Sequence, residues 1–166
     1  MKIDDMVLVY EYSFWADRRI LATCAQVNDA QYAAVTALGS LRATLIHVVF
    51  ALWAWRLLLQ GNPWPDDLTE ADLPTLSDLE ARWQTERQAM QTYLGSLHDE
   101  DLSGIVRYPI EGGIVRERVL WHCLLHVVNH ATQHRSEVAM LLTSYGHSPG
   151  DLDFTAFLNE HFGLPT

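Results

Sequence analysis

Residues 41–60, LRATLIHVVFALWAWRLLLQ, constrain the fold of this chain more than any other segment. The segment has the length of a globular helix and is apolar on nearly all sides, so such a helix has to be surrounded by other parts of the protein. Ser40 before it is a suitable N-cap, and Gly61 after it is a typical stop signal. We therefore expect a central helix within a helical protein.

Helical periodicity also dominates most of the remaining sequence. The pattern Ser77-x-x-Glu80 is a capping box, which indicates a helix start, and residues 28–36 interrupt the periodicity. The proline-containing stretch GNPWPDDLTEADLPT is interpreted as a long loop inside one domain, because no second core-sized segment follows it. The predicted helices cover residues 7–27, 41–60, 78–97, 117–145 and 154–160.

The stretch before the last long segment has a different pattern. In residues 105–118, IVRYPIEGGIVRER, two short runs rich in β-branched residues flank Glu111-Gly112-Gly113. This pattern is typical of a small hairpin or of an irregular crossover loop, and we favour the hairpin. The whole chain, residues 1–166, is then expected to be a single all-α domain, a four-helix bundle with one long connection.

Composition and charge exclude several classes of partner. The chain has 21 acidic and 11 basic residues and a net charge of −10, whereas nucleic acid and anionic membranes require a basic patch. The apolar stretch 45–59 contains His47 and Arg56 and is too short to span a bilayer. Cys24 and Cys123 are too few for a disulfide framework, and we expect buried, inert thiols. With no signal pattern in MKIDDM, these features indicate a cytoplasmic protein.

Four of the eight histidines follow each other at intervals of four residues: His122, His126, His130 and His134. Residues four apart share one face of a helix, and two imidazoles at that spacing can bind one metal ion. Each step of four turns about 40° around the helix axis, so all four side chains cannot reach one ion. The spacing is equally compatible with the pairs 122/126, 126/130 and 130/134.

A third ligand would have to come from another helix, because a catalytic zinc site has three protein ligands and an open position. His47 is the only histidine in residues 41–60. A single buried histidine is most often a hydrogen-bonded core residue, but the histidine pattern elsewhere favours a metal ligand. We expect the other three histidines, His98, His147 and His161, at the surface.

Three motifs stand in the order YSFWADRRIL, GSLRATLIHVVFALWAWRLLLQG and LLHVVNHATQHRSEVAMLLTSYGHSPGDLDFTAFL. Together they resemble the DinB/YfiT-like family of damage-inducible metalloproteins, and the resemblance covers nearly the whole chain. It implies a four-helix bundle with up-down-down-up topology. It also implies a role in the stress response and assembly into a homodimer.

The resemblance further implies which residues bind the metal. Members of the family use one histidine of the second helix and an HxxxH pair of the last long helix, which here are His47, His130 and His134. His126 corresponds to a frequent neighbour that is usually not a ligand. This chain has QHRSE where many members have HHRGQ, so that Glu137 replaces a glutamine. Glu137 either hydrogen-bonds a ligand histidine or pairs with an arginine at the surface.

Three functions are compatible with these patterns. The resemblance implies a metal-dependent transferase or hydrolase, in which the ion activates a low-molecular-weight thiol or a water molecule for attack on a small-molecule substrate. Zinc is the expected metal, and imidazole ligands also suit nickel and iron. No nucleophile with its base, of the Ser/His/Asp or Cys/His type, stands out in the sequence, so no catalytic residue is identified. The alternatives are a non-catalytic metal-binding stress-response protein and a metal-free helical interaction module.

Overall fold

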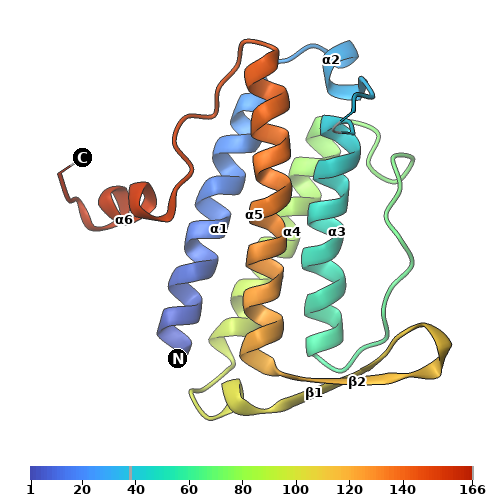
Figure 1. Ribbon diagram of the computed structural model, residues 1–166, viewed down its shortest axis with the longest axis vertical. Coiled ribbons are helices and arrows are strands. Elements are labelled where there is room, and N and C mark those ends of the chain that lie inside the picture. The colour runs from blue at the N-terminus through green and yellow to red at the C-terminus, as the bar shows by residue number, and fades with distance from the viewer. Residues whose placement is uncertain (38, 166) are drawn as a thin grey trace.

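The computed structural model describes residues 1–37 and 39–165, apart from the side chain of Glu111. Its main body consists of four long helices that run side by side (Figure 1). Helices α1 and α3 each contact both α4 and α5. In Figure 1, α1 and α5 run in one direction and α3 and α4 in the other. The bounds of the four are α1 Ile3–Cys24, α3 Leu41–Leu59, α4 Leu76–Gly95 and α5 Leu120–Ser144.

Two large buried clusters form most of the core, and both draw side chains from all four long helices. One contains Ile20, Leu45, Leu79 and Val138 among others. The second lies further along the helices and contains Phe14, Leu52, Met90 and Leu124. A third, smaller cluster among the described residues packs Phe157 against Trp15 and Ala16. Burial of these faces agrees with the helical periodicity of the sequence, and the chain is mainly helical as predicted.

A two-stranded antiparallel sheet joins α4 to α5, so the hairpin prediction is confirmed. Strand β1, Ile105–Pro109, pairs with β2, Val115–Val119, with Ile105 opposite Val119. The prediction that the last long helix begins near residue 117 is wrong, because residues 115–119 pair with β1 and the helix starts at Leu120. A purely all-α description therefore needs this small sheet added.

Several helix ends also differ from the predictions. The capping box of α4 is formed by Thr75 and Asp78, not by Ser77 and Glu80: the Thr75 hydroxyl accepts from the Asp78 N–H, and the Asp78 carboxylate accepts from the Thr75 N–H. An aspartate at this position serves as well as the expected glutamate, so the helix starts two residues earlier.

The N-terminal helix likewise begins at Ile3 instead of residue 7. Asp4 and Asp5 lie in its first turn, where acidic side chains stabilise a helix by interacting with its dipole. Two short helices complete the chain. Helix α2, Asp29–Ala33, lies in the segment that interrupted the periodicity, and α6, Phe154–Phe162, extends the predicted terminal helix by two residues.

Helix α3 has the ends that the sequence predicted. The Ser40 hydroxyl accepts a hydrogen bond from the Ala43 N–H, and Gly61 follows the helix with φ near 80°. By length and composition alone, the full helix, Leu41–Leu59, could cross a membrane. The prediction that the apolar segment is too short to span a bilayer is therefore wrong. However, 56% of its apolar window is buried inside the protein. A core helix has the same composition.

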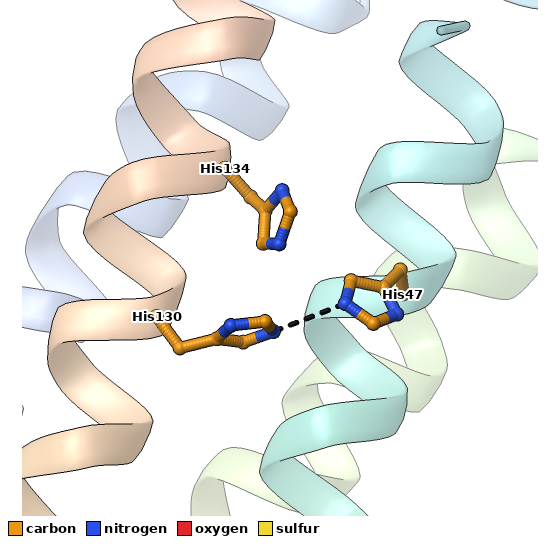
Figure 2. A group of neighbouring side chains, drawn as sticks. All are labelled: His47, His130 and His134. Atoms are coloured by element: carbon orange, nitrogen blue, oxygen red, sulfur yellow. Dashed lines mark hydrogen bonds between the residues drawn. The ribbon is translucent and has the colours of Figure 1, made fainter.

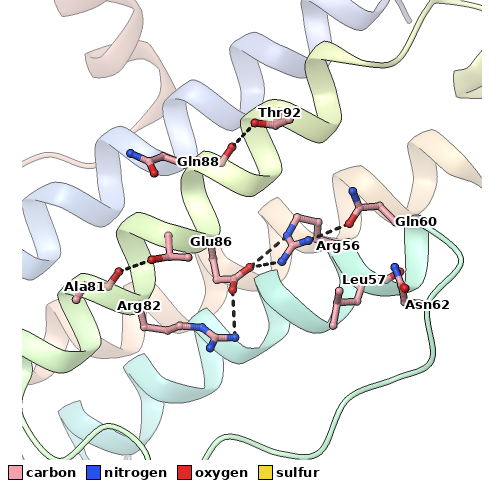
Figure 3. A network of polar contacts seen from close by, with 10 residues as sticks. Arg56, Leu57, Gln60, Asn62, Ala81, Arg82, Glu86, Gln88 and Thr92 are labelled. Carbon is pink, nitrogen blue, oxygen red and sulfur yellow. Dashed lines mark hydrogen bonds and ion pairs between the residues drawn. The ribbon is translucent and has the colours of Figure 1, made fainter.

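A buried carboxylate lies between α3 and α4 (Figure 3). Glu86 of α4 is 3% exposed, and its carboxylate accepts from Arg56 of α3 at 2.7 Å. Arg82, one turn earlier on α4, lies 3.1 Å from the other carboxylate oxygen. Two guanidinium groups therefore compensate the burial of one acid, which would otherwise be costly.

A second buried ion pair connects α1 to α5. Arg135 Nη1 lies 2.8 Å from Asp17 Oδ1, and the two residues are 2% and 4% exposed. Trp83 of α4 donates its indole N–H to Asp17 at 3.1 Å, and Arg135 also donates to Ser13 at 2.8 Å. Burial raises the pKa of Asp17, and the adjacent Arg135 guanidinium opposes this shift. Three long helices thus meet at one carboxylate.

Replacing Asp17 by asparagine should lower the free energy of unfolding by about 3–5 kcal/mol, because it leaves the Arg135 charge buried without a partner. Urea denaturation of the wild type and the variant measures this difference. Glu160→Gln is the control, because it removes the partner of Arg19 in an exposed ion pair. Equal losses of stability in the two variants would contradict the structural importance of the buried pair.

Candidate metal centre

The packing of α3 against α5 brings three histidines together. His47 lies on α3, and His130 and His134 lie one turn apart on α5, so that their rings face one another across the interface (Figure 2). The Nε2 atoms of His47 and His130 are 3.0 Å apart. Each ring contributes one nitrogen, and these three nitrogens all lie within 4.8 Å of one another.

Glu137 determines the orientation of the third imidazole. Its carboxylate accepts a hydrogen bond from His134 Nδ1 at 2.7 Å, from a position almost one turn further along α5. With the proton on Nδ1, the lone pair of His134 is on Nε2, and the ring nitrogen away from Glu137 points toward His47 and His130 (Figure 2).

The local environment favours neutral imidazoles, the form that binds a metal ion. Burial lowers the pKa of His130 to about 4, and the neighbouring His134 and His47 act in the same direction. The pKa of His47 is also lowered, first by the partial burial of its ring, one part of which stays exposed, and then by His134, while the carboxylates of Asp67 and Glu137 oppose the shift. Lone pairs on these rings are therefore available near neutral pH.

This donor set fits a divalent ion. In a tetrahedral zinc site with zinc–nitrogen bonds of about 2.0–2.1 Å, the ligand nitrogens lie about 3.3–3.4 Å apart. The observed 3.0 Å between His47 and His130 is close to this value. Three imidazole ligands would also leave part of the coordination sphere of such an ion open, as in catalytic zinc sites.

The remaining histidines lie outside this group. The ring of His126 stacks on His130 with a centroid distance of 5.8 Å and meets Trp55 at 5.1 Å. His122 is exposed one turn earlier and contacts Trp121. Of the three expected at the surface, His98 and His161 are exposed and His147 is half-buried.

A cavity of about 400 Å³ opens beside His47. Ile46 and Phe50 of α3 line it together with Asp67 and Glu70 from the long loop after α3. These loop acids were not predicted to lie at the site. The many acidic residues in GNPWPDDLTEADLPT could have suggested a functional loop, but nothing in the sequence shows that this loop folds back beside the second turn of α3.

The two cysteines are buried, as predicted. Cys24 is 1% exposed, and burial raises its pKa to about 12. Cys123 is 2% exposed, and burial also raises its pKa, although Arg118 acts in the opposite direction. Both thiols therefore stay protonated near neutral pH, which makes them poor nucleophiles.

These features define a mainly helical protein with a three-histidine site that can hold a metal ion. The sequence matches the model of the DinB family over residues 2–161, and the chain belongs to that family. No curated protein matches it. The family resemblance deduced from the three sequence motifs is thereby confirmed.

Replacing Glu137 by alanine should weaken zinc binding by about 10–100-fold, the usual effect of removing a carboxylate that orients a ligand histidine. Competition with a chromophoric chelator measures the dissociation constant. Glu137→Gln keeps an acceptor but not the charge, so it should fall between the wild type and Glu137→Ala. Unchanged affinity in Glu137→Ala would contradict the orienting role.

Proposed function

We propose that this protein binds one divalent metal ion through His47, His130 and His134 and acts as a metal-dependent enzyme on small molecules. The convergence of three imidazole nitrogens from two helices is the observation that carries this proposal. Zinc is the proposed metal, since three imidazole ligands with an open position suit it, and nickel or iron are the alternatives.

The chemistry would be the activation of a low-molecular-weight thiol or of water. When bound at such a site, a divalent ion lowers the pKa of a water ligand toward about 7 or stabilises a thiolate. Asp67 lines the cavity beside His47, where its carboxylate can accept the proton that such a nucleophile releases, whereas Glu70 of the same lining forms an ion pair with Arg42 at 3.3 Å. A transferase or a hydrolase fits these groups.

The access to the site supports an enzyme over a non-catalytic metal-binding stress-response protein. His47 is exposed, and the cavity of about 400 Å³ beside it has the size of a small-molecule pocket. A structural metal site is usually closed by four protein ligands. A metal-free interaction module would leave the convergence of three imidazoles unexplained.

We also propose that the four long helices form the up-down-down-up bundle of the family as one domain, which is supported by the helix directions in Figure 1. The cytoplasmic location, the homodimer and the absence of nucleic-acid and membrane partners stay predictions from the sequence. Trp64, which is 49% exposed, is a candidate for a dimer contact.

Metal analysis of protein purified without a histidine tag tests the site. We expect about one ion per chain in the wild type, and a loss of most of that metal in His47→Ala and in His130→Ala, because two imidazoles bind far more weakly than three. His122→Ala is the matched control, since it removes an exposed histidine of the same helix and should keep the metal.

Equal metal content in His47→Ala and His122→Ala would overturn the proposed ligand set. For the enzymatic part of the proposal, the metal-loaded protein is assayed with low-molecular-weight thiols and electrophilic or ester substrates. Turnover that disappears in His130→Ala supports it. A metal-loaded protein without turnover in any of these assays favours the non-catalytic alternative.

A further inference from the structure

A second cavity lies beside the histidine group, on the side of the hairpin. It measures about 350 Å³, within the range of small-molecule pockets. Trp55 of α3 and Tyr108 of β1 form aromatic walls, with ring centroids 5.5 Å apart. The remaining lining comes from β2 and from the first turns of α5: Arg116, Arg118, His122, Cys123 and His126.

The hairpin register explains why two arginines reach this cavity. Arg116 lies opposite Tyr108, and Arg118 lies opposite Val106. Alternate residues of a strand share one face, so these four side chains lie on the same face of the sheet. Val106 packs against the helical core, which shows that this face is turned toward the helices.

The opposite face of the hairpin carries a compensated arginine. Arg107 of β1 is directly opposite Glu117 of β2, and their side chains form an exposed ion pair with the short contact Arg107 Nε–Glu117 Oε1 of 2.5 Å. Arg116 and Arg118 have no such partner among the side chains that the structure describes. Within the described part of the chain, Arg118 donates only to the backbone carbonyl of Glu117, at 2.8 Å.

The residues around this cavity therefore create a local positive charge in a protein whose net charge is −10. Its lining contains two guanidinium groups and no aspartate or glutamate among the described side chains. Guanidinium groups bind carboxylate and phosphate oxygens through paired charge-assisted hydrogen bonds. The aromatic walls suit a flat or apolar group attached to such an anion.

One residue contacts both the cavity and the three-histidine site. His126 lines the cavity, lies 5.1 Å from Trp55 between ring centroids, and also stacks on His130. A small molecule held in the cavity would therefore lie next to His126, one helical turn from the first candidate ligand on α5.

We propose that this cavity binds a small organic anion with a planar body, whose carboxylate or phosphate group contacts Arg116 and Arg118 while the body lies against Trp55 and Tyr108. Anion binding follows from the hairpin and its charges alone. The use of this anion as the substrate, or as the thiol co-substrate, rests on the metal-dependent function proposed above.

Calorimetric titration of the metal-free protein at low ionic strength tests the proposal with three related probes: benzoate, phenyl phosphate and the neutral benzamide. We expect one or both anions to bind, and benzamide to bind about tenfold more weakly or worse, because it lacks the charge that strengthens hydrogen bonds to guanidinium. The tighter anion shows whether the cavity prefers a carboxylate or a phosphate ester.

Arg116→Gln and Arg118→Gln should each weaken binding of the preferred anion by about tenfold or more. Arg107→Gln is the matched control, because it removes an arginine of the same hairpin from the opposite face, and it should leave the affinity unchanged. The proposal is overturned if neither anion binds, if benzamide binds as tightly as the anions, or if Arg107→Gln has the same effect as the other two variants.

The same variants separate this inference from the proposed metal function. Arg116→Gln and Arg118→Gln should keep about one metal ion per chain, because both residues lie on the hairpin and not among the three histidines. Anion binding by a protein that takes up no metal when metal is supplied would refute the proposed function and leave the anion site standing. The reverse result, metal without anion binding, would refute only the anion site.

Discussion

The buried ion pair between Asp17 and Arg135 is the interaction on which the arrangement of α5 depends. Successive residues of a helix differ by about 100° around its axis, so burying Arg135 against α1 determines which way its neighbour His134 points. With Arg135 held in the core, His134 and His130 are directed to the side of the helix that faces α3. The pair therefore sets the rotation of the helix that carries most of the candidate site.

In the candidate site, packed helices hold the three histidines, and accessible cavities lie beside them. Three imidazoles come from the well-packed interface of α3 and α5, and the hydrogen bond from His134 to Glu137 orients one of them. The groups that would contact a substrate come partly from the α3–α4 loop and from the hairpin, and partly from α3 and α5. Chemically similar metal centres can in this way serve different substrates, because the loops change more easily than the helices that hold the ligands.

Much of the helical architecture could be predicted because it depends on local patterns. Ser40 and Gly61 delimit α3 as their cap chemistry predicts, and the β-branched runs on both sides of Glu111-Gly112-Gly113 indicated a hairpin. Errors occurred where two local signals compete: Thr75 with Asp78 forms a box as well as Ser77 with Glu80 would. The start of α5 depends on pairing with β1, a contact between residues distant in sequence, and periodicity alone could not detect it.

For the site, the sequence by itself determined the donor types and the series of four histidines on one helix. The spacing of these histidines left three ligand pairs open. The family resemblance pointed to His47, His130 and His134, and only the tertiary structure shows that α3 brings His47 to that pair instead of to His122 and His126. The placement of Arg116 and Arg118 beside Trp55 likewise depends on tertiary structure. Helix and strand periods are local properties of the chain, whereas the juxtaposition of side chains from different elements results from long-range packing.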